Sequence, residues 1–208
     1  MIPKLLLFSL VALLLPSLCS FEQKPFRYEK YLHEQVSQVF GDSSSYDCRR
    51  AQIYQESGDN PKATSDFAGW KKMRFDTVTA VKKGYGAAGL AQFIWPTAER
   101  FGAKTISTKA ADDAIFESDI YNPYWSMQAM CIYMKTIRGT LLCTTNSKAR
   151  RSLMADRKLL ELCSLAGYNA GEGRVLRSLK KHSSWRDIRN QLPLETRNYA
   201  ENIISVSN

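Results

Sequence analysis

The sequence predicts a mostly α-helical fold built as a single domain. Along much of the chain, apolar residues recur at three- and four-residue steps, which is the spacing of an amphipathic helix. Alternation of β-branched residues is scarce, and no internal repeat, heptad array or low-complexity segment is present. The chain has 208 residues, of which 44% are hydrophobic and 24% are charged, so it has room for one core of fair size rather than two.

The first nineteen residues differ from the rest and are expected to be a signal peptide. Lys4 supplies a positive charge, residues 5–15 form a nearly continuous apolar run, and small residues follow near a cleavage point. The apolar run is too short to span a bilayer, which takes about 20 residues. We therefore expect an exported, periplasmic protein. The alternative is a lipoprotein acylated at Cys19. Lipidation sites typically have a small residue just before the cysteine, whereas this chain has Leu18 there.

Four further cysteines allow two disulfides in an oxidising compartment. Cleavage after residue 19 leaves an even number of them, namely Cys48, Cys131, Cys143 and Cys163. Four cysteines permit three pairings, and the sequence does not choose among them. The alternative is that some are buried free thiols, because cysteine is common in protein cores.

The chain is strongly basic, with a formal net charge of +9. A charge of this sign favours contact with polyanions. Nucleic acid is the usual first candidate, but an exported protein meets anionic cell-wall polymers and membrane surfaces more often, so we expect no nucleic-acid partner. The alternative is a solvated basic surface without a specific partner.

Two helices are expected at the start of the mature chain. Apolar spacing predicts the first over residues 28–40, with Gly41 as its end. A polar loop follows, and then a helix over residues 47–56, which is stopped by the turn formers of residues 57–61. Glu56 therefore lies near the C-terminus of a helix.

The rest of the chain is expected to be helices separated by loops. Residues 67–83 are basic and lead into glycine-rich residues 84–89, which we interpret as an excursion with a loop. Residues 140–151 are polar and basic and are also predicted to be a loop. Further helices are predicted over residues 96–101, 123–138, 153–165, 173–181, 184–191 and 194–204.

Carboxylates are the candidates for acid chemistry. With two histidines, no CxxC pair and no HExxH motif, the chain has little material for a zinc site or a histidine triad, and no metal or cofactor is expected. Glu56 follows Ile53 and Tyr54, which suggest burial, and both burial and the helix C-terminus raise a carboxyl pKa. A raised pKa suits a general acid near neutral pH. From position alone, a solvated surface glutamate is the simpler interpretation.

Four segments of the chain match a set of sequence motifs in the same order. They are Glu56–Ser65, similar to ESGxNPxAxS; Gly86–Phe93, similar to GAxGLMQ and followed by Pro96-Thr97-Ala98; Gly167–Val175, similar to AYNAGPGRV; and Leu192–Tyr199, similar to LPxETRNY. In these motifs the chain resembles the soluble lytic transglycosylase family, a branch of the lysozyme-like fold. A fifth segment, Asp119–Pro123, is similar to the entrance of that family's next helix, though less closely. Any one alone is a weak signal, whereas four in the right order are specific.

The resemblance implies a small, stand-alone, monomeric enzyme with a cleft between helical lobes. It places the catalytic domain at residues 47–208, after an N-terminal helical segment at residues 20–46. It implies cleavage of the β-1,4 bond between N-acetylmuramic acid and N-acetylglucosamine of peptidoglycan. Glu56 then acts first as acid and afterwards as base, so that 1,6-anhydromuramic ends form without a second carboxylate.

The resemblance also implies substrate contacts around Glu56. Gln92 and Asn169 would hydrogen-bond the sugar from opposite walls, and Tyr199 would reach the Glu56 carboxyl. The alternatives are that the tyrosines are core aromatics and that Gln92 is a satisfied loop amide. The full set of predicted substrate-binding residues is Ser57, Gln92, Phe93, Tyr168, Asn169 and Tyr199.

Departures from the family pattern leave other functions open. The spacing between the first two motifs is longer than is usual for the family, and the additional residues, Gly69–Lys83, are expected to reshape one wall of the cleft. In addition, Ala91 and Gly167 replace larger residues of the motifs. A hydrolytic muramidase would need a second carboxylate, with Asp59, Asp66 or Asp119 as the candidates. A non-catalytic glycan-binding envelope protein is the other alternative. For an active enzyme, the expected setting is a secretion, conjugation or phage machine that crosses the envelope.

Overall fold

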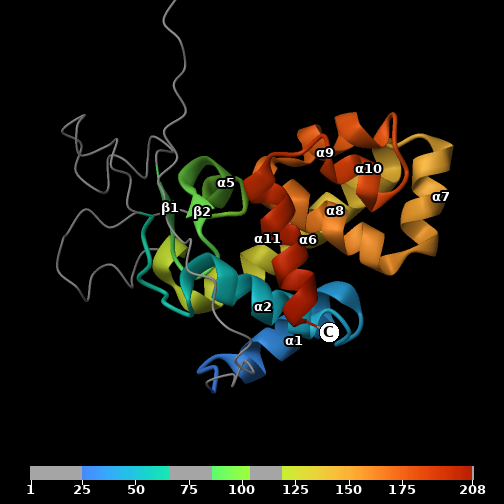
Figure 1. The fold of residues 1–208 in the computed structure, drawn as a ribbon. Coiled ribbons are helices and arrows are strands. Elements are labelled where there is room, and N and C mark those ends of the chain that lie inside the picture. Colours follow the sequence, from blue (N-terminus) through green and yellow to red (C-terminus); the bar gives the residue numbers. More distant parts are fainter. Residues whose placement is uncertain (1–24, 66–85, 104–118, 208) are drawn as a thin grey trace, which may run out of the picture.

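The computed structural model describes residues 25–65, 86–103 and 119–207, and these ranges are mostly helical, as predicted (Figure 1). Two short strands, β1 (Ala87–Ala88) and β2 (Phe93–Ile94), pair antiparallel. The helical elements are α1 (Glu29–Phe40), α2 (Tyr46–Ser57), α5 (Trp95–Arg100), the 3₁₀ helix η2 (Asp119–Tyr121), α6 (Pro123–Thr144), α7 (Ser147–Ala155), α8 (Arg157–Ala170), α9 (Glu172–Leu179), α10 (Trp185–Arg189) and α11 (Leu194–Val206).

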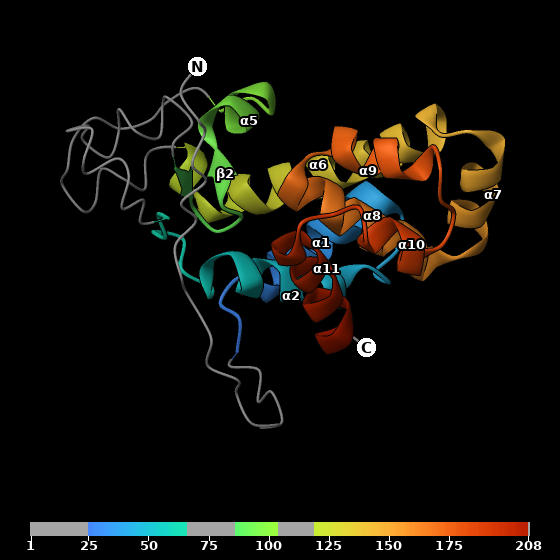
Figure 2. The same cartoon turned by 45° about the horizontal axis from the view of Figure 1, so that its top comes forward.

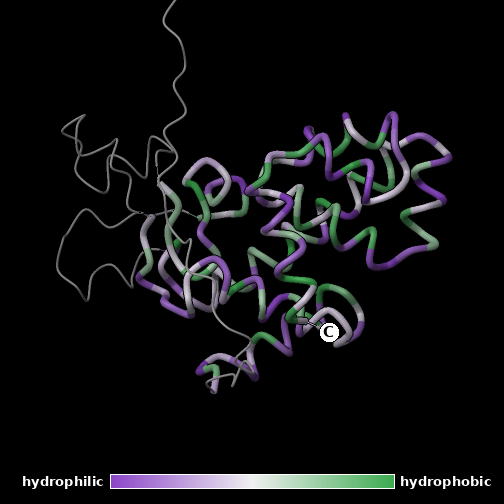
Figure 3. The backbone as a smooth tube through the Cα atoms, in the orientation of Figure 1, coloured by the Kyte–Doolittle hydropathy of each residue, from purple (hydrophilic) through white to green (hydrophobic). Residues whose placement is uncertain are grey.

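Buried residues form two hydrophobic clusters, which divide the molecule into two lobes. The β lobe joins α1, the two strands, α5 and the first half of α6, with Leu32, Ile53 and Met127 among its fully buried residues. The α lobe joins α7 to α11 with the second half of α6. Tyr133 and Tyr168 pack against both clusters. Figure 3 shows hydrophobic and hydrophilic stretches alternating along the helices, as one-sided burial requires.

Helix α6 runs through both lobes. Pro123 occupies its first turn, and the Asn122 side chain caps it by accepting hydrogen bonds from two backbone N–H groups. Met127 contributes to the β lobe, whereas Ile137 and Leu141 contribute to the α lobe. In both Figure 1 and Figure 2, α5 and the strands lie at one end of the molecule and α7 lies at the other.

A buried ionic cluster ties three helices together. Glu161 of α8 accepts hydrogen bonds from Arg49 of α2 and from Arg138 of α6. Arg49 is fully buried, so its charge depends on this partner. The cluster fixes the position of α2, the helix that carries Glu56.

The sequence-based boundaries hold for most helices and fail at two places. The helix predicted over residues 153–165 is wrong in its bounds, because α7 ends at Ala155 and α8 runs from Arg157 to Ala170. The loop predicted over residues 140–151 is wrong, because α6 continues to Thr144 and α7 begins at Ser147. Leu141 and Leu153 are fully buried and hold these turns against the α lobe, while the basic residues between them face outward. Asp156 then separates α7 from α8 by accepting a hydrogen bond from Leu159 N–H.

The cysteines do not form the disulfides that the sequence allows. Cys48, Cys131, Cys143 and Cys163 are all free thiols, and three of them are buried, which agrees with the alternative of core cysteines. Burial raises the pKa of Cys131 and of Cys163 to about 12, so these thiols stay protonated and unreactive at neutral pH.

Three predictions fall outside the described residues, namely the signal peptide, the Cys19 lipidation site and the basic segment Gly69–Lys83. None of the helices that the structure describes combines the length and the hydropathy needed to cross a bilayer.

Candidate active site

Glu56 stands in the last turn of α2, where the chain leaves the helix sharply. Gly58 adopts a left-handed conformation (φ 58°), and its N–H donates to Tyr54 O at 2.8 Å. Asp59 is left-handed as well (φ 68°), and both of its carboxylate oxygens accept from Arg50, at 2.6 and 2.7 Å. This paired turn gives Glu56 a fixed place at the helix end. Tyr54, expected to be buried, is instead 45% exposed.

Glu56 is half-buried as a residue, and its carboxyl is desolvated by the surrounding protein. Ile53 lies fully buried one turn below, and the Tyr199 hydroxyl of α11 donates to Glu56 Oε1 at 2.5 Å. Desolvation by burial raises the pKa of Glu56 to about 7, and the Tyr199 hydrogen bond partly opposes this rise. The carboxyl is therefore poised to release and regain a proton near neutral pH.

Tyr168 joins the two lobes beside Glu56. It stands near the end of α8, and its hydroxyl donates to Ala91 O in the β lobe at 2.7 Å. Its ring packs against Phe93 and Tyr133. Burial raises the pKa of Tyr168 well above the ordinary value, and the charge of Glu56 adds to the rise, so the two groups are neighbours. Tyr168 is half-buried, and its predicted contact with substrate stays a prediction.

Gln92 fastens the loop that leads into β2. Its backbone is left-handed (φ 48°), and its amide nitrogen donates to Ala63 O at 3.1 Å and to Gly89 O at 2.9 Å. Both amide hydrogens are therefore used by the protein, which fits the alternative of a satisfied loop amide. The amide oxygen remains, so Gln92 can only accept a hydrogen bond from a ligand.

Gly89 allows this loop to pack against η2. Its φ is +78°, and a Cβ at this position would lie 1.9 Å from the carbonyl oxygen of Ile120. Its N–H donates to Ala63 O at 2.8 Å. Gly89 thus allows a close approach between two backbone segments of this chain.

Asn169 is exposed at the end of α8 and is held by a residue that the sequence did not single out. Its Oδ1 accepts from the hydroxyl of Thr196 at 2.8 Å, and Thr196 is itself 2% exposed. This bond directs the amide nitrogen of Asn169 outward as a donor. Thr196 stands three residues before Tyr199 in the last motif, and this spacing on one helix was the signal that could have found it.

Two predicted substrate contacts do not fit the structure. Phe93 is 2% exposed and packs against Trp125 and Tyr133 in the core, so the prediction that it contacts substrate is corrected. The hydroxyl of Ser57 donates to Ile53 O at 3.1 Å, within its own helix, rather than into the site.

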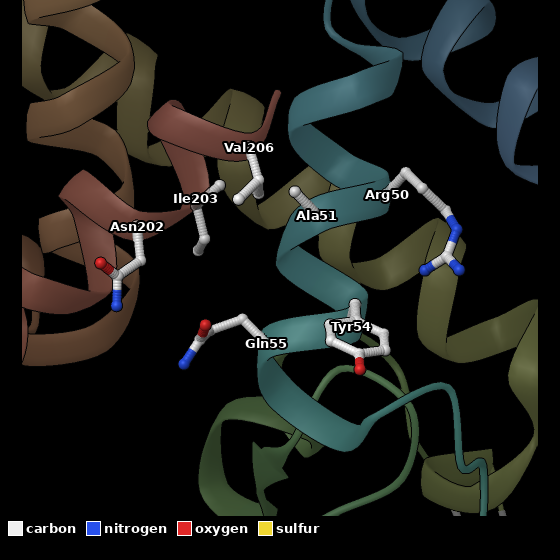
Figure 4. A pocket seen from close by; sticks show the side chains of 7 residues that line it. All are labelled: Arg50, Ala51, Tyr54, Gln55, Asn202, Ile203 and Val206. Carbon is white, nitrogen blue, oxygen red and sulfur yellow. The ribbon is translucent and has the colours of Figure 1, made fainter. Parts of the chain in front are cut away.

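The far side of α2 carries a small hollow of about 90 Å³ between α2 and α11 (Figure 4). Its α2 residues lie roughly opposite Glu56 around the helix, given ~100° per residue. This hollow is therefore separate from the Glu56 site. It is lined by Arg50, Ala51, Tyr54, Gln55, Asn202, Ile203 and Val206.

Comparison with known proteins identifies the family. Residues 45–191 match the model of the transglycosylase SLT domain, and a search of curated proteins gives no match. The matched range covers more than two thirds of the chain and contains Glu56, Gln92 and Asn169, while Tyr199 follows it. The lysozyme-like helical fold and the order of the motifs agree with this match. The chain belongs to the SLT-type lytic transglycosylase family, whose domain acts on peptidoglycan.

Proposed function

We propose that this protein is a peptidoglycan lytic transglycosylase that leaves 1,6-anhydromuramic ends. The observation that carries the proposal is the Glu56 carboxyl, desolvated beside Tyr199, with a pKa of about 7 and one oxygen held by the Tyr199 hydroxyl. A single carboxyl of this kind can serve as acid and then as base in one reaction cycle.

In the first step, protonated Glu56 gives its proton to the glycosidic oxygen between N-acetylmuramic acid and N-acetylglucosamine. The bond from that oxygen to the anomeric carbon breaks, and the acetamido oxygen of the muramic residue bonds to the same carbon. Tyr199 stabilises the carboxylate that forms, through its bond to Oε1. The Asn169 amide nitrogen and the Gln92 amide oxygen offer the sugar one donor and one acceptor.

In the second step, the Glu56 carboxylate takes the proton from the 6-hydroxyl of the same muramic residue. The 6-oxygen then attacks the anomeric carbon and displaces the acetamido oxygen. Glu56 is left protonated for the next cycle, and no water is consumed. A pKa near 7 serves both steps, because neither form of the carboxyl is strongly disfavoured at neutral pH.

The hydrolytic alternative needs a second carboxylate, and the described residues lend it little support. Asp59 accepts hydrogen bonds from both terminal nitrogens of Arg50, Nη1 and Nη2, and is therefore already paired. Asp119 begins η2, and Asp66 lies outside the described residues. The only group of the described chain that perturbs the pKa of Glu56 is Tyr199.

Product analysis tests the proposal. Purified peptidoglycan is incubated with the wild-type protein and with Glu56→Gln, and soluble products are identified by mass spectrometry. We expect anhydromuropeptides from the wild type and a loss of about 10²–10⁴-fold in the variant, the usual contribution of a general acid. Products with reducing ends would identify a hydrolase. No release by either protein would favour a glycan-binding role.

We also propose that the protein acts outside the cytoplasm and opens the wall locally for a secretion, conjugation or phage machine. The support is the signal-peptide pattern of residues 1–19 and the basic composition. Fractionation of cells that express the full chain, with and without these residues, tests the export.

A further inference from the structure

The α lobe carries a hollow of about 470 Å³ whose lining is cationic. Its walls come from α9 and the turn that follows it, with one further residue from the segment before α11. Lysines and arginines make up most of the lining, and no aspartate or glutamate of the described chain contributes to it. A hollow of this kind favours an anion. The lining residues are Arg174, Arg177, Ser178, Lys180, Lys181, His182 and Gln191.

Three of these cations form a row along α9 and the turn after it. Arg177 stands three residues after Arg174, and Lys181 stands four residues after Arg177, which are the spacings of neighbours on one side of a helix. At 1.5 Å per residue, the row is about 10 Å long. It can therefore contact more than one anionic group of an extended ligand.

The four cations of the hollow form no ion pair with other described residues. The acidic side chains of α9 and α10 are engaged elsewhere. Glu172 of α9 accepts from the Tyr133 hydroxyl at 3.5 Å, and Asp187 of α10 accepts from the Ser184 hydroxyl at 2.6 Å. Neighbouring like charges repel one another, so an anion that enters the hollow relieves this repulsion.

The row begins close to a residue that contacts sugar in the proposed function. Arg174 stands five residues after Asn169, and Gly171, with φ +84°, turns the chain from α8 into α9 between them. Five residues of chain separate their Cα atoms by at most about 18 Å. Helix α9 also packs against α8 and α6 (Figure 1). A strand bound at Asn169 therefore lies near the start of the row.

The anions that peptidoglycan itself offers are carboxylates. Its two N-acetylated sugars are neutral, and the acidic groups belong to the peptide stems that the muramic residues carry. Arginine can bind a carboxylate through two parallel hydrogen bonds, which adds direction to the charge attraction. Arg174 and Arg177 are both exposed and so are available for such contacts.

We propose that this hollow is an exosite for the carboxylates of peptide stems on the strand that occupies the Glu56 site. The proposal rests on the proposed function and narrows its substrate class to strands that carry acidic peptides. The exosite takes no part in bond cleavage. It holds the strand through charge and hydrogen bonds at the α lobe, beside the contacts of Asn169.

The test measures binding rather than turnover. Glu56→Gln serves as the parent protein, so that the strands stay intact during the experiment. The probe is purified peptidoglycan sacculi treated with hydrofluoric acid, which removes polymers attached through phosphodiesters. The comparison is the same material after its carboxyl groups are converted to amides with a carbodiimide and ammonia. We expect the parent to co-sediment with the acidic sacculi and to bind the amidated sacculi at least severalfold more weakly at low ionic strength.

Within this parent, Arg174→Gln/Arg177→Gln removes two charges from the hollow. We expect binding to acidic sacculi to weaken about three- to tenfold, as the loss of two exposed ion pairs would cause, and binding to amidated sacculi to stay unchanged. Lys148→Gln/Arg186→Gln is the matched control, because it removes two exposed cations of the α lobe that do not line the hollow. Circular dichroism establishes that all variants are folded.

Three results would overturn the proposal. An equal loss in the control variant would show that net charge alone attracts the protein to sacculi. Equal binding to acidic and amidated sacculi would exclude carboxylates as the ligand. Loss of all binding after the hydrofluoric acid treatment would identify phosphate polymers as the partner. Because none of these measurements needs turnover, they are decided separately from the release of anhydromuropeptides by the wild type.

Discussion

At the scale of single residues, the chemistry depends on how Glu56 is desolvated without being sealed from substrate. Glu56 is half-buried as a residue, while Ile53 below it is fully buried and Tyr199 beside it is 7% exposed. Burial favours the neutral acid, and the single hydrogen bond from Tyr199 favours the carboxylate. The balance between these two effects puts the pKa near 7 rather than at the ordinary 4.5.

The pH dependence of activity follows from this pKa. The first step needs protonated Glu56, so kcat/KM should fall about tenfold per pH unit above about pH 7, which is the pKa of the free enzyme. Initial rates on a soluble glycan fragment between pH 5 and 9 measure it. A fall that begins below pH 5 would mean that another group supplies the proton.

The contribution of Glu56 to the stability of the wild type should depend on pH in the opposite sense to that of a salt-bridged carboxylate. The folded pKa of about 7 lies above the ordinary 4.5, so the folded protein holds the proton more tightly than the unfolded chain does. The wild type therefore loses stability as the pH rises from 4.5 to 7 and regains none above it. The variant lacks this loss and should be more stable than the wild type by on the order of 2 kcal/mol at pH 9. Urea unfolding at pH 4 and pH 9 measures the difference, and equal differences at both would contradict the raised pKa.

Residues of the site were predictable where a motif fixed them and not where packing did. The motifs led to Glu56, Tyr168 and Tyr199, and the structure brings these three together. Gln92 and Phe93 stand in the same motif, yet one fastens a loop and the other lies in the core. A sequence motif records that a residue type is needed, but not whether its side chain faces the ligand or the protein.

At the scale of elements, the site is held by loops that lock onto neighbouring backbone. The turn from Gly89 to Gln92 is bound to Ala63 by two hydrogen bonds, one from Gly89 N–H and one from Gln92. Ser65 N–H donates to Ala87 O at 2.9 Å and continues the same contact. The segment after α2 and the segment before β2 therefore form one unit beside Glu56.

Substitution of Gly89 should break this unit. In Gly89→Ala, the new Cβ meets the Ile120 carbonyl oxygen at 1.9 Å, so the backbone must shift, and the left-handed φ adds strain of about 1–2 kcal/mol. Gly102→Ala is the matched control, because Gly102 has φ +90° and no atom within 4 Å of its Cβ position. We expect Gly102→Ala to be folded and active and Gly89→Ala to lose most activity. Thermal unfolding measures the stability of the two variants, and product release measures their activity. Comparable losses of stability and activity in Gly89→Ala and Gly102→Ala would show that backbone strain alone accounts for the effect.

Helices were predictable from the sequence where their apolar face was dense. The ends of α1 and α2 were expected at Gly41 and within residues 57–61, and in the structure Gly41 and Gly58 end these helices in left-handed conformations. The turns around residues 140–151 were missed, because Leu141 and Leu153 are the sparse apolar contacts in a basic stretch. Their burial depends on the α lobe as a whole, which local periodicity cannot report.

At the scale of the whole molecule, charge is unevenly distributed. Residues 147–191, which span α7 to α10, carry 11 basic and 4 acidic residues, or +7 of the total +9. Four of these cations, Arg174, Arg177, Lys180 and Lys181, line a hollow of about 470 Å³ on the α lobe and form no ion pair with other described residues. This end of the molecule should attract anionic polymers of the wall.

Raising the salt concentration should therefore lower the rate of cleavage of intact peptidoglycan more than the rate of cleavage of short fragments. We expect Lys180→Glu/Lys181→Glu to lower the rate on intact material severalfold at low ionic strength and to lose this difference as ionic strength rises. The rate on a short neutral glycan fragment should be unchanged, because these lysines lie outside the Glu56 site. Equal effects on both substrates would show that the reversal disturbs the site itself.

Helix α6 also decides how the molecule behaves mechanically. At 1.5 Å per residue, its 22 residues form a rod of about 33 Å whose side chains are embedded in both cores. Bending this helix would break apolar contacts in both cores, so we expect little hinge motion of one lobe relative to the other. Because both cores share this helix, the two lobes should unfold together in one cooperative transition.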